Sequence, residues 1–373
     1  MSIAIDLETD TNVEGARIKV IGVGGGGNNA VDRMIEAGVN KAEFICVNTD
    51  AQQLSNVKAP TVLQIGNKVT NGLGAGAKPE IGRQAAEETK EEIKKLVADS
   101  EMVFVTAGMG GGTGTGAAPI IAETAKGMGI LTVAVVTKPF FFEGPQRMRN
   151  AEEGIKNLAE KVDALVTIPN DLLFKIADKN TNIEDSFRLA DDVLRQGVQG
   201  IIEVITQRGI MNCDFADVRT IMKDSGVAHM GVGVGKGEDA AQEAVMNAIE
   251  SPLLETSIEG AQNVLLNITG GTEFSLLEMG QVSSIVKEKV SPEANIILGT
   301  AKDESLKDEI KVTLIATGLN SGAKGSQMAG AVRRDMFSSN TASSNNDDAI
   351  FTRKLKPGMD NINVPSFFHP NNK

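Results

Sequence analysis

The chain has 373 residues, 41% of them hydrophobic, and carries a formal net charge of −12 at pH 7. This length accommodates about two domains with sizeable cores, and the acidic balance argues against a protein that binds nucleic acid through bulk positive charge. The two cysteines, Cys46 and Cys213, lie far apart without a nearby histidine, which argues against a disulfide framework or a structural zinc site. With no basic N-terminal region and no run of about 18 apolar residues, we expect a cytoplasmic protein without membrane insertion.

The first of two glycine-rich loops lies near the N-terminus. Residues 1–15 are polar and acidic and are expected to form a flexible arm. A strand is predicted over 17–23, followed by four glycines and a helix from Ala30. Gly22, Gly24 and Gly27 fit the pattern G-x-G-x-x-G. Asp50 follows a second strand predicted over 44–48, at the place of the ribose-binding acid in dinucleotide-binding dehydrogenases. An NAD-dependent oxidoreductase is therefore one hypothesis.

The second glycine-rich loop, Gly110–Gly116, contains five glycines and two threonines. It lies between an apolar strand predicted over 102–107 and a helix predicted over 117–125. Without Cβ atoms the backbone can approach a ligand closely, and successive N–H groups at a helix N-terminus bind phosphate. The loop therefore predicts a nucleotide site, and the dehydrogenase hypothesis leaves it without a role.

The sequence lacks a lysine-dependent phosphate loop. Gly231–Gly237 is one residue too short for a Walker A motif and has no Ser or Thr after Lys236, and Gly72–Pro79 fails likewise. A nucleotide would therefore be held by backbone amides. The glycine-rich segment Gly66–Lys78 is equally consistent with a flap over a ligand and with a surface connection.

Strands and helices alternate through the first half of the chain. A helix is predicted over 79–98, and further buried strands over 130–137 and 164–169. Strands that are apolar on both faces and alternate with helices predict a doubly wound parallel sheet. Loops at the carboxyl ends of these strands should line one nucleotide site.

A long helix predicted over 183–208 joins this part to a second one. Its apolar residues recur at steps of three and four, and at 1.5 Å per residue it spans roughly 39 Å. Beyond it, a smaller α+β domain is predicted, with its strands over 227–234, 263–269, 295–300 and 310–317 and its helices over 238–250 and 275–290.

Two pairs of acidic residues have two interpretations each. Asp191 and Asp192 lie near the start of the long helix, where acids also stabilise a helix N-terminus. Asp214 and Asp217 are three residues apart and share a helix face. They fit a helix cap with a first-turn acid, or acids that act on a nucleotide, in which case that nucleotide belongs to a neighbouring molecule.

The C-terminal segment differs in composition from the rest. Residues 319–358 are rich in Ser, Asn, Gly and Ala, and we expect a disordered linker. The apolar island Ile362–Phe368 predicts a short recognition peptide. The expected domains are 1–15 (arm), 16–182 (nucleotide-binding domain), 183–209 (central helix), 210–318 (C-terminal domain), 319–358 (linker) and 359–373 (partner-binding peptide).

The motifs in order resemble the tubulin and FtsZ superfamily, and the bacterial FtsZ family in particular. The resemblance rests on the second glycine loop and on Val20–Asn29, Asn48–Gln52, Phe142–Gly144 and Asn212–Asp217, together with the terminal peptide. It implies a protein that binds and hydrolyses GTP, polymerises head to tail and forms the cytokinetic ring at midcell. The peptide reads Val364-Pro-Ser-Phe-Phe where Ile-Pro-Ala-Phe-Leu is commoner in the family.

The resemblance also implies residue roles. Nucleotide binding falls to Gly25, Gly26, Gly27, Asn28, Asn29, Gly108, Gly111, Gly112, Thr113, Gly114, Thr137, Glu143, Arg147, Asn170, Phe187 and Asp191. Asp214, Asp217 and Asn212 would complete hydrolysis from the next subunit. Mg²⁺ would be bound mainly by phosphates and water, without a protein metal site. Val364, Pro365, Phe367 and Phe368 would bind membrane-anchoring division proteins similar to FtsA, SepF or ZipA.

Three hypotheses therefore follow from the sequence. The first is a self-assembling GTPase of the division ring, and the second is the NAD-dependent oxidoreductase. The third is a regulatory nucleotide-binding module without hydrolysis.

Overall fold

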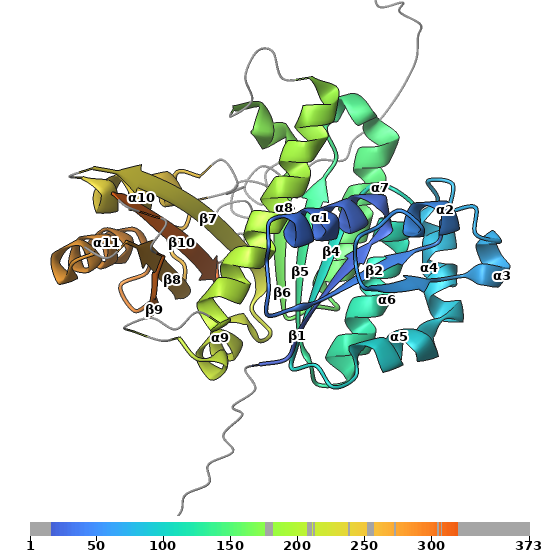
Figure 1. Ribbon diagram of the computed structural model, residues 1–373, viewed down its shortest axis with the longest axis horizontal. Coiled ribbons are helices and arrows are strands. Elements are labelled where there is room, and N and C mark those ends of the chain that lie inside the picture. Colours follow the sequence, from blue (N-terminus) through green and yellow to red (C-terminus); the bar gives the residue numbers. More distant parts are fainter. Residues whose placement is uncertain are drawn as a thin grey trace, which may run out of the picture. The chain divides into compact units, whose positions relative to one another are not determined.

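The computed structural model in Figure 1 describes residues 16–175, 182–206, 211, 213–237, 239–251, 257–271, 274–303, 306 and 308–319. Several predictions fall on other residues. They are those for the arm 1–15, for Asn212, for the terminal peptide with Val364, Pro365, Phe367 and Phe368, and, apart from Leu319, for the linker.

Ten strands of the described residues form one sheet. In spatial order they are β3 (Thr61–Gln64), β2 (Glu43–Asn48), β1 (Ile18–Val23), β4 (Met102–Gly108), β5 (Leu131–Lys138), β6 (Ala164–Pro169), β7 (Gly226–Lys236), β10 (Glu309–Thr317), β8 (Asn263–Gly270) and β9 (Asn295–Lys302). Neighbours from β3 to β7 are parallel, β7–β10 and β10–β8 are antiparallel, and β8–β9 are parallel. The predicted parallel α/β sheet with a smaller α+β part is confirmed.

Strand β7 belongs to both parts of the sheet. Its first residues, Gly226–Ala228, pair with β6, and the following His229–Lys236 pair with β10. The segment Gly231–Gly237, which lacks the full Walker A motif, therefore lies mostly within strand β7. Cβ atoms at Gly233 and Gly235 would lie 2.1 Å and 2.0 Å from backbone oxygens of the covering helix, so these glycines allow a helix to pack closely against β7.

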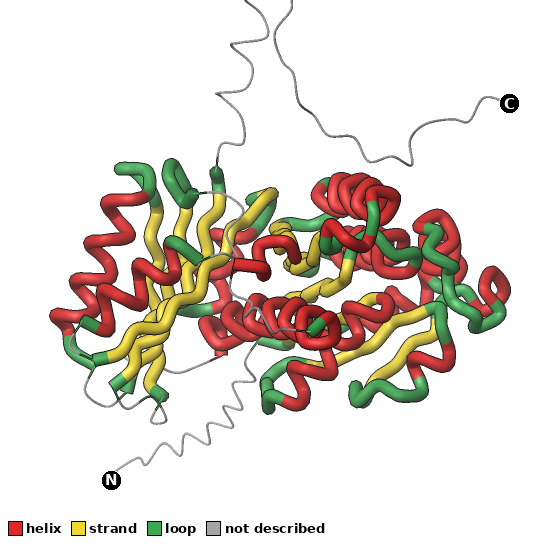
Figure 2. The backbone as a smooth tube through the Cα atoms, turned by 90° about the horizontal axis from the view of Figure 1, so that it is seen from above, coloured by secondary structure: helices red, strands yellow, loops and turns green. Residues whose placement is uncertain are grey.

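Helices cover both faces of the parallel part of the sheet (Figures 1 and 2). On one face lie α1 (Gly24–Glu36), α8 (Ile183–Thr206) and α9 (Phe215–Met222). On the other lie α4 (Pro79–Glu88), α5 (Lys90–Val97), α6 (Thr113–Gly127) and α7 (Pro145–Ala159). The shorter elements are α2 (Ala51–Leu54), α3 (Asn67–Thr70), η1 (Phe141–Glu143) and η2 (Asn170–Lys175).

Successive residues of a strand belong alternately to two hydrophobic cores, one on each face of the sheet. Val20 and Phe104 belong to the core under α1 and α8, whereas their neighbours Ile21 and Val105 belong to the core under α6. This follows from the two-residue period of a strand, and it explains why the strands read as continuous apolar runs.

The smaller part of the sheet is covered by α10 (Ala240–Ile249) and α11 (Leu276–Lys289). The opposite face of β8 and β10 contributes Leu265 and Ile315 to the core shared with α8 and α9. Helix α8 therefore packs against both parts of the molecule, as the apolar stripe of the long helix predicted.

Three predicted helix boundaries were wrong. Helix α6 begins at Thr113, four residues before the predicted start at Ala117. Helix α1 begins at Gly24 instead of Ala30. The helix predicted over 79–98 is divided into α4 and α5 at Thr89, whose buried hydroxyl donates to the Ala85 carbonyl and accepts from the Gly66 N–H. The apolar stripe continues through Thr89, so the sequence carries no sign of the break.

Candidate functional site

A cavity of 330 Å³ opens at the carboxyl ends of β1, β2 and β4, where parallel sheets bind ligands. Of the predicted nucleotide-binding residues, it is lined by Gly25, Gly26, Gly108, Gly111, Gly112, Thr113, Gly114 and Arg147. The lining residues absent from the predicted set are Val23, Gly24, Asn48, Asp50, Gln53, Leu73, Gly74, Ala75, Gly76 and Ala77.

The first glycine loop is the first turn of α1. Residues Gly24–Gly27 are helical, and Val23 at the N-cap supplies no side-chain hydrogen bond. The first N–H groups of a helix have no partner within the helix and carry a partial positive charge. Because Gly25 and Gly26 also line the cavity, this turn is suited to bind an anion.

The last three predicted residues of this loop have different surroundings. A Cβ at Gly27 would lie 2.3 Å from the Thr106 carbonyl oxygen, so Gly27 lets α1 approach β4. The buried Asn28 amide, oriented by its hydrogen-bond network, donates to the carbonyls of Gly22 (2.8 Å) and Gly24 (3.2 Å). Asn29 is exposed, and the structure places none of the three in the cavity wall.

The second glycine loop ends in another helix N-terminus, because α6 begins at Thr113. A Cβ at Gly24 would lie 2.8 Å from the Gly114 N atom, so the two helix starts are in contact. The hydroxyls of Thr113 and Thr49 are 2.7 Å apart. Around Gly111 no atom lies within 4 Å of an added Cβ. Two helix N-termini thus converge on one cavity, and Gly111 faces its open space.

A third wall is formed by residues 73–77. Leu73 forms an isolated antiparallel bridge with Asp50, and the Gly74 N–H donates to the Thr49 carbonyl at 3.3 Å. Asp50 itself caps α2, its Oδ1 accepting from the N–H groups of Gln52 (2.9 Å) and Gln53 (3.2 Å). Part of the glycine-rich segment Gly66–Lys78 thus lines the cavity, and its glycine content was the signal in the sequence.

Arg147 extends the cavity toward the β5–α7 connection. Its Nε lies 3.1 Å from Oε2 of Glu143, whose side chain is 8% exposed, while that of Arg147 is 51% exposed. The other Glu143 oxygen accepts from the Phe140 N–H at 2.8 Å. Glu143 therefore holds Arg147 at the cavity. Thr137 is buried behind it, with Oγ1 3.7 Å from a Cβ built on Gly108.

An aromatic cluster follows the ends of β5 and β6. Phe140 contacts Phe142, Phe174 and Phe187 with ring centroids 5.0–5.5 Å apart. Asn170 follows β6 directly and is 5% exposed. Its Oδ1 has no hydrogen-bond partner in the described structure. An unsatisfied buried amide oxygen is costly, so Asn170 is suited to accept a hydrogen bond from a ligand.

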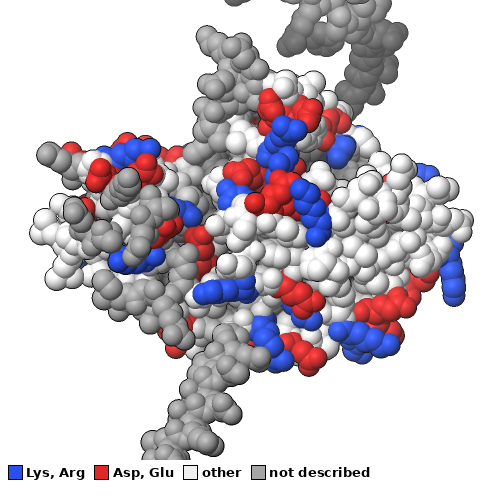
Figure 3. Space-filling view, viewed as in Figure 1, with Lys and Arg blue, Asp and Glu red and all other residues white. Residues whose placement is uncertain are grey.

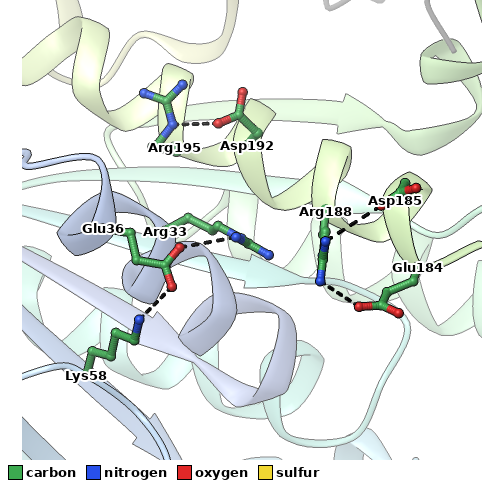
Figure 4. Close-up of polar contacts among 8 residues, drawn as sticks. All are labelled: Arg33, Glu36, Lys58, Glu184, Asp185, Arg188, Asp192 and Arg195. Atoms are coloured by element: carbon green, nitrogen blue, oxygen red, sulfur yellow. Dashed lines mark hydrogen bonds and ion pairs between the residues drawn. The ribbon is translucent and has the colours of Figure 1, made fainter. Parts of the chain in front are cut away.

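Asp191 lies on α8 and faces α1. Burial raises the pKa of Asp191 to about 7, and the charge of Arg33 opposes this rise. Figure 4 shows the ion pairs Arg33–Glu36, Lys58–Glu36, Arg188–Glu184, Arg188–Asp185 and Arg195–Asp192. Arg33, the cation that acts on Asp191, is paired with Glu36 at 3.1 Å, and the effect of burial on the pKa of Asp191 prevails.

The surface around this region mixes both signs of charge. On the face in Figure 3, Lys and Arg side chains alternate with Asp and Glu side chains. Such interleaving produces no large field of one sign on this face.

Asp214 and Asp217 form a capping box at the start of α9. Oδ1 of Asp214 accepts from the Asp217 N–H at 2.8 Å, and Oδ2 of Asp217 accepts from the Asp214 N–H at 3.1 Å. Asp214 is exposed, and neither acid lines the cavity. The interpretation of Asp214 and Asp217 as a helix cap is therefore confirmed. If they also act on a nucleotide, that nucleotide must belong to another molecule.

The described residues contain no cluster of three or more His, Cys, Asp and Glu side chains suited to a metal ion. Burial raises the pKa of the Cys46 and Cys213 thiols to about 12, so neither is a nucleophile at neutral pH. Among the described helices, none combines the length and apolarity needed to cross a membrane.

Comparison with known proteins identifies the family. Residues 17–178 match the Tubulin/FtsZ family, GTPase domain, and residues 226–320 match the FtsZ family, C-terminal domain. The structure of an empty FtsZ dimer from M. jannaschii shares 46% identity at a TM-score of 0.78, covering 82% of this chain and 89% of that chain.

More distant structures share the fold. CetZ2 from Haloferax volcanii, solved as a GTPγS-bound protofilament, has 19% identity and a TM-score of 0.68 over 80% of this chain and 92% of that chain. CetZ1 from the same organism, a GDP-bound monomer, has 20% identity and a TM-score of 0.70 over 82% and 95%. None of these findings supports the oxidoreductase hypothesis. The resemblance carried by the glycine loops is confirmed, and the chain belongs to the FtsZ family of tubulin-like GTPases.

Proposed function

We propose that this protein binds GTP in the 330 Å³ cavity, hydrolyses it when a second molecule joins head to tail, and assembles into the filaments of the bacterial division ring. The observation that carries the proposal is the convergence of the N-termini of α1 and α6 on one cavity. Unpaired helix N–H groups and the helix dipoles favour a polyphosphate there without a lysine. Residues Gly25, Gly26 and Gly111–Gly114 hold the phosphates.

The base lies toward the aromatic cluster in this proposal. Phe187 packs against the guanine face, and Oδ1 of Asn170 accepts a hydrogen bond that the described structure leaves unmade. The Asp191 carboxylate accepts the N1–H and exocyclic amino group of guanine, a donor pair that adenine lacks. Arg147 and Glu143 contact the ribose side. Guanine specificity therefore depends on Asp191 in its ionised form.

Hydrolysis needs an acid that the cavity does not supply. Asp50 is the carboxylate among the lining residues, and its Oδ1 already caps α2. Asp214 and Asp217 are exposed or half-exposed on another element, so they can reach the nucleotide of a neighbouring molecule, where they orient the attacking water together with Asn212. The related structures were solved as a dimer and as a protofilament, which supports such assembly.

Positioning and electrostatics then supply the catalysis. Mg²⁺, when bound together with the nucleotide, would be held mainly by phosphate oxygens and water and would offset the charge of the polyphosphate. A head-to-tail contact that does not close on itself generates a filament. The terminal residues Val364, Pro365, Phe367 and Phe368 tether that filament to membrane-anchoring division proteins in the cytoplasm at midcell.

The decisive variant separates capping from catalysis. Asp214→Ser keeps a side-chain cap for α9 but removes the carboxylate. We expect unchanged thermal stability and GTP binding, with turnover reduced by about 100-fold. Glu278→Ala is the control, because Glu278 forms an equivalent capping box with Ser275 in α11. Full turnover in Asp214→Ser would show that Asp214 is only a cap.

Assembly is tested by concentration and by mixing. Specific GTPase activity should rise with protein concentration as filaments appear in electron micrographs, and filaments should require GTP. The activity of a mixture of Asp214→Ser with a nucleotide-binding variant should exceed the summed activity of the two alone. In mixed filaments Asp214→Ser supplies the bound GTP, and the nucleotide-binding variant supplies the intact acids. Concentration-independent turnover would refute catalysis in trans. Binding without turnover at any concentration would favour the regulatory module.

A further inference from the structure

Three charged side chains meet at the end of the sheet opposite the cavity. Lys126 lies one residue before the end of α6, Asp163 immediately precedes β6, and Asp224 follows α9. Nζ of Lys126 donates to Oδ1 of Asp224 (2.8 Å) and to the Val162 carbonyl (2.8 Å), and lies 3.3 Å from Oδ1 of Asp163. We call Lys126, Asp163 and Asp224 the basal triad.

The triad is built into the fold through Asp163, which is 5% exposed. Its Oδ2 accepts from the Thr132 N–H at 2.9 Å, and its Oδ1 accepts from the Asp224 N–H at 3.4 Å. Asp163 therefore joins the start of β5 to the turn after α9. Burial opposes the charge on Lys126, but the hydrogen bond to Asp224 and the charge of Asp163 outweigh it and raise the pKa of Lys126. The lysine is charged throughout the physiological range.

Asp224 adopts a backbone conformation that serves this contact. Its φ is 51°, in the left-handed region that residues other than glycine seldom occupy. Its side chain is 64% exposed, and its Oδ1 contacts Nζ of Lys126. The turn thus directs a carboxylate from the end of α9 onto the end of α6.

Other hydrogen bonds also attach helix α9 and the turn after it to the nucleotide-binding part: the Ser225 hydroxyl (3.4 Å) and the Gly226 N–H (3.0 Å) donate to the Asp163 carbonyl. Helix α9 has eight residues, and Arg219 donates to the Gly129 carbonyl at 3.3 Å. On the other side, the Thr317 hydroxyl donates to the Ile221 carbonyl at 3.2 Å. The apolar side chains of α9 pack into the core shared with α8, and the polar contacts at the C-terminal end of α6 contribute to the orientation of α9 and of the acids at its start.

Helix α6 connects this contact to the phosphate site. It has 15 residues, roughly 22 Å, and runs from Thr113 in the cavity wall to Gly127. Most of its side chains are buried against the sheet and neighbouring helices. It is therefore a stiff element, with the phosphate loop at one end and the basal triad at the other.

We propose that Lys126 is a positioning residue for GTP hydrolysis: through Asp224 it sets the orientation of α9, so that Asp214 and Asp217 are placed for the nucleotide of the neighbouring molecule. This inference rests on the proposed function in trans. Lys126 touches neither nucleotide, and its effect belongs to turnover in the assembled state.

The test uses the full chain with three variants and one control. Lys126→Met keeps the aliphatic stem and removes the charge, Lys126→Arg keeps the charge, and Asp224→Asn breaks the exposed arm of the triad. Lys161→Met is the control, because Lys161 also pairs with α6, through Glu123 at 2.8 Å, and no hydrogen bond or ion pair among the described residues joins it to α9. We expect turnover per assembled subunit to fall about tenfold in Lys126→Met and about threefold in Asp224→Asn, with GDP affinity of the unassembled protein unchanged.

Three outcomes decide the matter. Recovery of at least half of the turnover by Lys126→Arg, no further loss in the Lys126→Met/Asp224→Asn double variant, and full turnover in Lys161→Met support positioning through one contact. If Lys126→Met melts at a lower temperature, Asp224→Asn decides, because its exposed pair contributes little to stability. Normal turnover in both variants while Asp214→Ser is inactive overturns this inference alone. Normal turnover in Asp214→Ser overturns the proposed function instead.

Discussion

Replacing Gly111 by alanine isolates phosphate binding from folding. No atom lies within 4 Å of the added Cβ, and Gly111 does not occupy the left-handed region. The folded state therefore accepts the methyl group, and the restricted unfolded chain should leave the unfolding free energy unchanged or raise it by about 0.4–1 kcal/mol. If this loop holds the phosphates as proposed, the methyl group would occupy space that a phosphate needs. Losing one hydrogen bond to a charged group costs about 1.5–3 kcal/mol, roughly a 10- to 100-fold loss of affinity.

The neighbouring glycine is the matched control. A Cβ at Gly112 would lie 2.7 Å from Cβ of Ala75 and 3.0 Å from the Lys78 N atom. Gly112→Ala must therefore displace the third wall, and we expect it to lose stability and affinity together. Calorimetric titration with GDP gives the affinity, and urea denaturation of the nucleotide-free protein gives the stability.

The informative result is the difference between the two variants. Gly111→Ala should lose affinity at full stability, and Gly112→Ala should lose both. Unchanged GDP affinity in Gly111→Ala would refute the assignment of this loop to the phosphates. A loss of stability in Gly111→Ala would refute the claim that its Cβ direction is open.

Two further predictions follow from burial. The pKa of Asp191 rises from 3.8 to about 7 on folding, so its contribution to the stability of the folded state is complete below pH 3.8 and is lost as pH rises to about 7. Denaturation of the wild type and of Asp191→Asn between pH 5 and 8 checks this. The GDP affinity should rise with pH through 7 in the wild type but not in Asp191→Asn. A Cβ at Gly116 would lie 1.9 Å from the Pro79 oxygen, so Gly116→Ala should destabilise the protein by about 1–3 kcal/mol. Gly127→Ala, with no atom within 4 Å of its Cβ, should be neutral or stabilising. Equal urea midpoints for the two variants would contradict the packing argument.

The strands were predictable because burial on both faces leaves a strong local signal. The strand predicted over 164–169 matches β6 residue for residue, and the one over 102–107 falls one residue short of β4. Strand β3 was missed because it has four residues at the sheet edge and is largely half-exposed. Such a strand needs no apolar run.

Helix starts in glycine were not predictable from propensity. Glycine disfavours a helix interior, yet Gly24–Gly27 form the first turn of α1. The buried Asn28 amide binds the Gly22 and Gly24 carbonyls, and the absence of a Cβ at Gly27 allows contact with Thr106. These tertiary contacts override the local preference.

Much of the glycine-rich part of the cavity wall could be predicted from the sequence, and the rest could not. A glycine loop between a strand and a helix determines by itself that backbone N–H groups can face a ligand, so Gly111–Gly114 could be named in advance. Only the tertiary structure showed that Gly27 packs against a strand while Gly111 faces open space. The sequence contains a glycine in both places and does not distinguish the two settings. It also brought residues 73–77 into the wall and left Asp214 and Asp217 outside it. Local pattern determines what a segment can do, and packing decides which neighbour it meets.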